Sequence, residues 1–148
     1  MKNIITKSLL ETKTFARKMA QEFLASERPR TGALVIGLEG DLGGGKTTFV
    51  QGFAKELGVK EKILSPTFVI LKKFEIPKGK FKTFYHIDCY RINAQDILNL
   101  EFDEIISNSK NIIIIEWADK IKKILPEQTI ILKFDFIDEE TREIEQNF

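Results

Sequence analysis

The sequence predicts a three-layer α/β domain in which helices cover both faces of a mostly parallel β-sheet. Three observations predict this fold. Segments of helical periodicity alternate with short apolar runs, as in folds built from repeated strand and helix units. The run Asn111 to Ile115 contains four consecutive isoleucines, which is typical of a strand buried on both faces. A glycine-rich loop at 40–47 separates an apolar run from a helical stripe, the order of a strand, a phosphate-binding loop and a helix.

The first part of the chain predicts two strands, each followed by a helix. Residues 3–7 predict a short strand, and the stretch 8–11 has the S-x-x-E spacing of a capping box, so a helix is expected to begin there. The apolar run 33–38 predicts the second strand. Apolar residues at helical spacing predict a helix over 46–57, which Gly58 is expected to end.

The second part predicts a hairpin and then further alternation. Residues 68–75 and 81–87, joined by a turn, predict an antiparallel hairpin. A short helix is expected over 95–102, and its extension through 106 stays open. Residues 118–125 predict a helix that follows the isoleucine run. Residues 129–136 predict a strand, whose more alternating pattern favours an outer position in the sheet.

Composition favours one globular domain over residues 1–148, because 148 residues with 43% hydrophobic content can fill one core but hardly two. The formal net charge of +1 provides no overall attraction to nucleic acid or lipid. It conceals a local asymmetry, since residues 55–82 carry +5 and residues 135–148 carry −5. A single cysteine excludes an internal disulfide, and no stretch has the pattern of a secretion signal or a membrane span. We therefore expect a soluble cytoplasmic protein that makes no membrane contact.

The loop from Gly40 to Thr47 fits the pattern G-x-x-x-x-G-K-T and predicts binding of a nucleoside triphosphate. The glycines at 43, 44 and 45 carry no Cβ, so successive backbone N–H groups can turn toward phosphate oxygens. Lys46 is expected to reach the β- and γ-phosphates. The Thr47 hydroxyl is placed to ligate a magnesium ion that bridges them, so the motif predicts both ATP and Mg²⁺.

Two carboxylates lie at the ends of predicted strands, where a triphosphate–magnesium site requires one. Glu116 directly follows the isoleucine run and could hold magnesium or orient the attacking nucleophile, although it could also merely cap the next helix. Asp88 closes the strand 81–87, and the alternative is a turn aspartate at a strand end. Which of the two is the main hydrolytic carboxylate stays open.

Four further features have two interpretations each. His86 is the only histidine and has no metal-ligand partners at suitable spacing, so we interpret it as a strand residue with ordinary packing and no catalytic role. Ser65, Pro66 and Thr67 form either a nucleotide-sensing loop or an ordinary junction between a loop and a strand. Trp117 is either a core residue or an aromatic beside the nucleotide. The lysine-rich stretch 72–82 is either a solvated hairpin or an RNA-contacting surface.

Taken together, four motifs resemble the TsaE family, the bacterial ATPases of tRNA threonylcarbamoyladenosine biosynthesis. They lie at 40–49, 65–68, 86–91 and 115–117, and their order and spacing match over roughly residues 8–145. The resemblance implies a P-loop NTPase-like domain that hydrolyses ATP slowly and serves a complex of TsaB and TsaD. That complex attaches threonylcarbamoyl to the adenosine beside the anticodon, so tRNA would be contacted indirectly or through the complex.

The resemblance also implies roles for individual residues. Thr47 and Glu116 would hold magnesium, Asp88 would be a switch carboxylate required for hydrolysis, and residues 65–67 would form the other switch. The catalytic residues implied are Asp88, Glu116 and Lys46. The nucleotide contacts implied are Thr12, Gly43, Gly44, Gly45, Lys46, Thr47, Thr48 and Arg142. The chain departs from the family pattern at Gly44, where alanine is usual, and at Cys89, where leucine is usual.

Other classes of protein share the phosphate loop. A small-molecule P-loop kinase normally has an arginine-rich lid, and the five arginines, at 17, 28, 30, 91 and 142, do not cluster as one. A GTPase would show an N-K-x-D motif, which this sequence lacks. A nucleotide-gated binding module with negligible turnover is the alternative that is not an enzyme.

Overall fold

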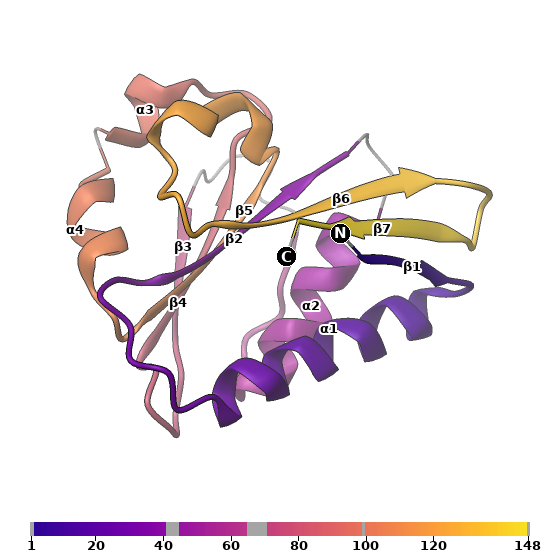
Figure 1. Cartoon of the computed structure of the whole chain (residues 1–148), viewed down its shortest axis with the longest axis horizontal. Helices are drawn as coiled ribbons and strands as arrows, with labels where there is room; N and C mark the ends of the chain where they lie inside the picture. The colour runs from indigo at the N-terminus through magenta and orange to yellow at the C-terminus, as the bar shows by residue number, and fades with distance from the viewer. Residues whose placement is uncertain (1, 41–44, 65–70, 99, 148) are drawn as a thin grey trace.

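The computed structural model describes residues 2–40, 45–64, 71–98 and 100–147. Within these residues, seven strands form one sheet, and helices lie on both of its faces (Figure 1). The elements in chain order are β1 (Lys2–Thr6), α1 (Leu9–Ala25), β2 (Leu34–Glu39), α2 (Lys46–Leu57), β3 (Leu71–Glu75), β4 (Thr83–Asp88), α3 (Ala94–Leu98), α4 (Phe102–Ser107), β5 (Asn111–Glu116), η1 (Ala118–Ile124), β6 (Ile130–Phe136) and β7 (Arg142–Gln146).

The strand order is β1-β7-β6-β2-β5-β4-β3. The four central strands, β6, β2, β5 and β4, are parallel to one another. The predicted hairpin is confirmed, because β3 pairs antiparallel with β4 at one edge. At the other edge β7 and β1 add a second antiparallel region. The predicted α/β fold with helices on both faces is therefore confirmed, with its parallel strands confined to the centre of the sheet.

Each face of the sheet has its own hydrophobic core. One core lies between the sheet and the packed pair α1 and α2, and the other lies under α3, α4 and η1. Strand β5 supplies both cores, because Ile112 and Ile114 face the first while Ile113 and Ile115 face the second. All four isoleucines are completely buried, which confirms the interpretation of the isoleucine run.

The helix boundaries around the phosphate loop follow the predicted signals. The Ser8 hydroxyl accepts a hydrogen bond from the Glu11 N–H at 3.0 Å and begins α1, as the capping-box spacing predicts. The Glu11 carboxylate accepts from the Lys7 N–H at 3.1 Å, one residue earlier than in the standard box. Gly58, with φ of 88°, ends α2 in the left-handed conformation that glycine adopts without a steric penalty.

The helical predictions after β4 need two corrections. The helix expected over 95–102 is two short helices, α3 and α4, and Glu101, in the left-handed conformation at φ of 59°, is the N-cap of α4. That turn brings both Ile97 and Phe102 into the same core. The helix expected over 118–125 is the 3₁₀ segment η1, which is interrupted by a kink at Ile121 (φ −124°, ψ 25°); Ala118 and Ile121 are its buried residues.

The C-terminal strands also differ from expectation. The expected outer position of the strand at 129–136 is wrong, because β6 lies between β2 and β7. Its alternation has another cause: Leu132 and Phe134 face the core under α1 and α2, whereas Lys133 and Asp135 are exposed on the opposite side. The acidic segment after residue 141, for which no strand was expected, forms β7.

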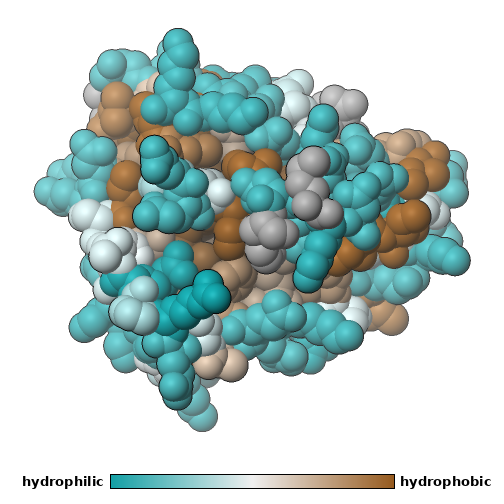
Figure 2. All heavy atoms as spheres, in the orientation of Figure 1, coloured by the Kyte–Doolittle hydropathy of each residue, from teal (hydrophilic) through white to brown (hydrophobic). Residues whose placement is uncertain are grey.

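Hydrophobic side chains are also exposed, and some lie where β1, β6 and the start of α1 come together. The space-filling view shows hydrophobic residues at the end of the molecule formed by β6, β7 and β1 (Figure 2). The exposed large apolar residues of these elements and the residues next to them are Ile5, Leu9, Leu10, Phe136 and Ile137. Among the helices of the described residues, none is both long and apolar enough to cross a lipid bilayer.

Candidate nucleotide site

The phosphate loop begins where the parallel strand β2 ends and α2 follows it. Gly40 comes directly after β2 with φ of 131°, and a Cβ built on it would lie 2.2 Å from the carbonyl oxygen of Phe134. Gly45, at φ of 94°, is the N-cap of α2, and no described side chain caps this helix end. The N–H groups of a helix start attract anions. Gly43 and Gly44, predicted to line the loop, lie outside the described residues.

Lys46 spans the phosphate loop. It is the first residue of α2, only 5% of its surface is exposed, and its ammonium donates a hydrogen bond to the Gly40 carbonyl oxygen at 2.5 Å. The same ammonium lies 4.2 Å from the centre of the Trp117 ring. Trp117 also packs against the core under α3, α4 and η1, which confirms the core interpretation; a position beside the nucleotide stays a prediction. The half-buried Thr48 lies in the first turn of α2, next to Thr47.

Thr47 and Glu116 meet although they are 69 positions apart. The Thr47 hydroxyl donates to the two carboxylate oxygens of Glu116 at 3.1 and 3.3 Å. This contact forms because β2 and β5 are parallel neighbours, so the loop after β2 and the last residue of β5 reach the same edge of the sheet. Glu116 is 3% exposed, and the hydrogen-bond partners recorded for its carboxylate among the described residues are Thr47 and His86.

The second partner of Glu116 is His86. The Nε2 atom of His86 lies 2.6 Å from the Oε2 atom of Glu116, and the two side chains are 1% and 4% exposed. His86 is a buried strand residue as expected, but the interpretation of ordinary packing missed this hydrogen bond. One signal was available: His86 and Asp88 are two apart in β4, so both side chains leave the same face of the strand.

We predict that replacing His86 by alanine impairs the site more than replacing it by glutamine. Alanine leaves a buried carboxylate without one partner, and loss of an outer partner of a metal-binding group typically lowers metal affinity or activity by about 10- to 100-fold. Glutamine retains an N–H donor. Magnesium dependence of ATP hydrolysis measures the effect, and equal magnesium requirements for the alanine variant and the parent would contradict the role.

Asp88 lies beside Glu116 in the register of β4 and β5. Its Oδ1 atom accepts a hydrogen bond from the Tyr90 N–H at 2.8 Å, which is the strand-end turn contact of the simpler interpretation. Burial raises the pKa of Asp88 above its ordinary value; the Tyr90 N–H opposes this shift, and the negative charge of Glu116 reinforces it. The carboxylate is therefore held at a position where its ionised form is disfavoured.

The raised pKa makes a prediction about stability. A carboxyl group whose pKa is raised by folding stabilises the protein at low pH, and this contribution is lost as the pH rises through the folded-state pKa. We expect Asp88→Asn to unfold at a higher temperature than the parent at pH 7. The difference should shrink as the pH falls toward about 4, the ordinary range of aspartate. Thermal unfolding at several pH values tests this, with exposed Glu139→Gln as the control; equal melting temperatures at pH 7 would contradict it.

Cys89 follows Asp88 and is completely buried. Burial, with a smaller effect of the Asp88 charge, raises the pKa of its thiol to about 12. Since the thiolate is the reactive form, only about one molecule in 10,000 carries it at pH 8. We predict that a thiol reagent labels the folded protein very slowly and the urea-unfolded protein at the rate of an ordinary cysteine. Rapid labelling of the folded protein would show that this strand end opens.

Of the two predicted nucleotide contacts near the chain ends, Arg142 lies beside Gly45, and Thr12 lies against Thr6. Thr12 is 1% exposed, and its hydroxyl oxygen lies 2.7 Å from the hydroxyl oxygen of Thr6. Thr6 in turn lies opposite Arg142 in the pairing of β1 with β7. A Cβ built on Gly45 would lie 3.5 Å from the Cγ atom of Arg142. The Arg142 guanidinium donates to the carbonyl oxygens of Asp138 and Thr141 at 2.6 and 3.0 Å. Its Nε atom is buried and has no hydrogen-bond partner among the described residues.

The described residues are compatible with a phosphate anion and a divalent cation. The site offers an uncapped helix start, a buried ammonium, and an arginine whose Nε lacks a partner among the described residues, all suited to an anion. The described residues contain no group of three or more histidine, cysteine, aspartate or glutamate side chains arranged to hold a metal ion. Thr47 and Glu116 would therefore share magnesium with phosphate oxygens and water, the usual way this ion is bound. Residues 65–67, predicted to form a switch, lie outside the described residues.

The fold and the site together define a P-loop NTPase-like domain: the sheet has a parallel centre and helices on both faces, a phosphate-loop sequence lies between β2 and α2, and a buried glutamate ends the adjacent strand. A sequence profile described as "Threonylcarbamoyl adenosine biosynthesis protein TsaE" matches residues 6–144. The chain therefore belongs to the TsaE family, whose members are proteins of tRNA threonylcarbamoyladenosine biosynthesis, as the resemblance of its motifs implied.

Individual relatives agree with the family assignment. The TsaE protein of Aquifex aeolicus is 35% identical over 97% of this chain and 94% of its own length. The TsaE protein of Haemophilus influenzae is 35% identical over 84% of this chain and 76% of its own. That of Nostoc sp. is 42% identical, but the match spans 62% of this chain and 56% of that protein. The crystal structure of YdiB from Bacillus subtilis superposes with a TM-score of 0.72 at 29% identity, covering 98% of this chain and 83% of that one.

Proposed function

We propose that the chain binds ATP with magnesium, hydrolyses ATP slowly, and supports threonylcarbamoyl transfer to tRNA as a cytoplasmic partner of a TsaB–TsaD complex. One observation carries this proposal: Thr47 and His86 hold the buried carboxylate of Glu116 beside the start of α2. A hydroxyl from the phosphate loop and a strand-end carboxylate are the two protein groups that a triphosphate–magnesium site requires.

Each group has a role in this proposal. Lys46 and the first N–H groups of α2 bind the phosphates, and Arg142 approaches them from β7. Glu116 and Thr47 hold the magnesium ion, which would neutralise charge on the phosphates, and His86 keeps Glu116 oriented. Asp88 holds or orients the attacking water through its position beside Glu116. Phe136, an exposed aromatic residue whose ring lies 4.7 Å from the Arg142 guanidinium, provides an apolar surface for the base.

A second candidate is a nucleotide-gated binding module with negligible turnover. It is favoured by the contacts of Glu116, because Thr47 and His86 together engage both of its carboxylate oxygens. A carboxylate held on both sides is well placed to respond to bound nucleotide but poorly placed to accept a proton from water. In this case ATP would change partner binding without being consumed.

Steady-state ATP hydrolysis with TsaB, TsaD and tRNA distinguishes the two candidates. We expect the parent protein to hydrolyse ATP in the complete mixture, Glu116→Ala to lose most of this activity, and the exposed control Glu139→Ala to retain it. Equal rates for the parent and Glu116→Ala would favour the binding module. Absence of hydrolysis by the parent in the complete mixture would overturn the ATPase proposal.

A further inference from the structure

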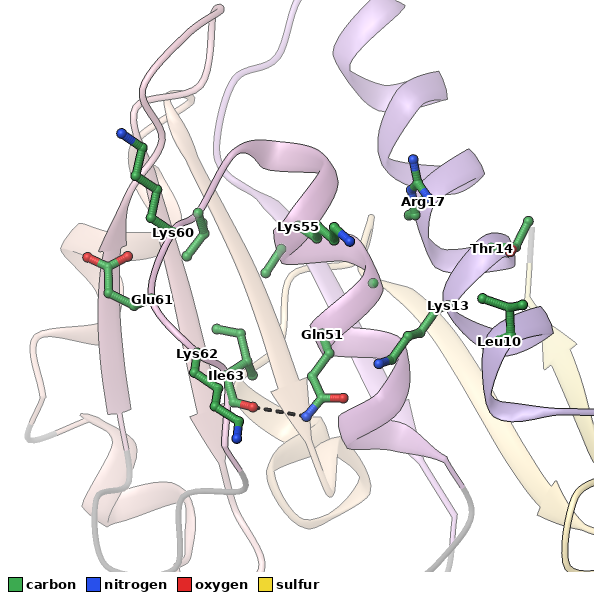
Figure 3. A pocket seen from close by; sticks show the side chains of 13 residues that line it. Leu10, Lys13, Thr14, Arg17, Gln51, Lys55, Lys60, Glu61, Lys62 and Ile63 are labelled. Atoms are coloured by element: carbon green, nitrogen blue, oxygen red, sulfur yellow. Dashed lines mark hydrogen bonds between the residues drawn. The ribbon is translucent and has the colours of Figure 1, made fainter.

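A groove of about 490 Å³ lies away from the nucleotide site, between α1, α2 and the segment 59–63 that follows α2 (Figure 3). Leu10, Lys13 and Arg17 approach it from α1, and Gln51 and Lys55 from α2. The Gln51 amide donates to the Ile63 carbonyl oxygen at 3.0 Å and so attaches the outer wall to α2. None of the described groups assigned above to phosphate, magnesium or catalysis lines this groove.

The walls of the groove are strongly basic. They carry Lys13 and Arg17 from α1, Lys55 from α2, and Lys60 and Lys62 from the outer segment, against the single carboxylate of Glu61. The side chain of Arg17 is already paired, since its Nε atom lies 3.5 Å from a carboxylate oxygen of Glu56. Within the described residues none of the four lysines forms an ion pair. Four ammonium groups on three elements thus remain available to an acidic ligand.

The groove also has an apolar component. Ala54 and Ile63, both buried, lie beneath it. Gly52 keeps α1 and α2 close together, because a Cβ there would lie 2.7 Å from the Lys13 carbonyl oxygen and would force the two helices apart. Leu10 on the rim is 72% exposed, and Leu64, which follows Ile63, is 58% exposed. Leu10 therefore adds exposed apolar surface to the rim of the groove, beside its lysines.

We infer that this groove binds a short segment of another protein that carries carboxylates on either side of an apolar side chain. The carboxylates would pair with the lysines, and the apolar side chain would cover Leu10 and the floor of the groove. A nucleic acid fits less well, because the described part of the lining contains no aromatic side chain on which a base could stack, and phosphates would leave Leu10 uncovered. A small anion would engage the lysines but not the leucine.

Chemical-shift mapping by NMR on the full chain tests the inference with a model ligand. The probe is the synthetic peptide Glu-Glu-Leu-Glu-Glu-Leu-Glu-Glu, and the comparison probes are the same peptide with serine for leucine and a single-stranded RNA hexamer. We expect the first peptide to shift amide signals of residues 10–17 and 59–63 and the serine peptide to shift them less. No shift with the leucine peptide at millimolar concentration, or larger shifts with RNA, would overturn the inference.

A charge-reversal series provides the second measurement. The double variant Lys13→Glu with Lys62→Glu should bind the leucine peptide at least 10-fold more weakly than the parent, with a smaller dependence on salt. Lys18→Glu, an exposed residue of α1 outside the groove, should bind as the parent does. Equal peptide binding by the double variant would overturn the inference. Nucleotide binding, followed in the same samples by shifts at residues 45–48, tests the proposed function separately.

A binding measurement with the purified TsaB–TsaD complex tests whether that complex is the natural partner of the groove. Of the three measurements, only this one depends on the proposed function. If the acidic segment belongs to that complex, the double variant should lose affinity for it while Lys18→Glu does not. Full affinity of the double variant for TsaB–TsaD would show that the acidic segment does not belong to that complex. The peptide measurement would still decide whether the groove accepts acidic segments.

Discussion

Replacing Lys46 by alanine is expected to lower ATP hydrolysis in the complete mixture by about 100-fold or more, because one preorganised charged group at a reacting phosphate is typically worth that much. Lys46 is almost completely buried between the Gly40 carbonyl and the Trp117 ring. Its ammonium is therefore held between the end of β2 and the start of α2. Affinity for a non-hydrolysable ATP analogue should fall as well, since the same ammonium contributes to phosphate binding.

Two comparisons separate this effect from a general loss of structure. Lys46→Met retains the apolar stem of the side chain and should be as inactive as Lys46→Ala while unfolding at a temperature closer to that of the parent. Lys18→Ala changes an exposed lysine of α1 and should leave hydrolysis unchanged. A Lys46→Met protein that hydrolyses ATP at the parental rate would show that the ammonium does not act on the phosphates.

The largest loss of stability is expected from Gly40→Ala. The added Cβ would lie 2.2 Å from the Phe134 carbonyl oxygen, so β2 and β6 would have to separate where they meet the phosphate loop. The residue also has φ of 131°, a conformation that side chains other than glycine rarely adopt. Strain and overpacking each cost about 1–3 kcal/mol, against a total stability of about 5–15 kcal/mol for a domain. Urea denaturation should show a loss of about 3–5 kcal/mol.

Gly79→Ala is the matched control for this substitution. Gly79 also has a positive φ, 97°, but apart from its two chain neighbours no atom of the described residues lies within 4 Å of a Cβ built there. Its substitution should therefore introduce backbone strain alone, and the difference between the two variants measures the clash with Phe134. Equal losses would mean that the backbone around Gly40 relaxes without cost.

Local signals in the chain were sufficient for the elements that form the phosphate loop. The isoleucine run, the capping residues Ser8 and Glu11, and Gly58 act through interactions within a few residues, so their effect is readable from the order of amino acids. The helix predicted over 46–57 begins and ends at those residues in the structure. The motif at 40–47 likewise requires only that a loop follow a strand and precede a helix.

The pairing of distant segments required the tertiary structure. Neither the place of β6 in the sheet nor the strand β7 could be read from polarity, because alternation reports which face of a strand is covered and not which strands lie on either side. The contact of His86 with Glu116 depends on β4 lying beside β5, and the position of Arg142 beside Gly45 depends on β7 closing against β6. Strand order results from the packing of the whole domain, so it cannot be read from a short motif. The motifs therefore predicted the phosphate loop, whereas the tertiary structure alone placed His86, Glu116 and Arg142 around it.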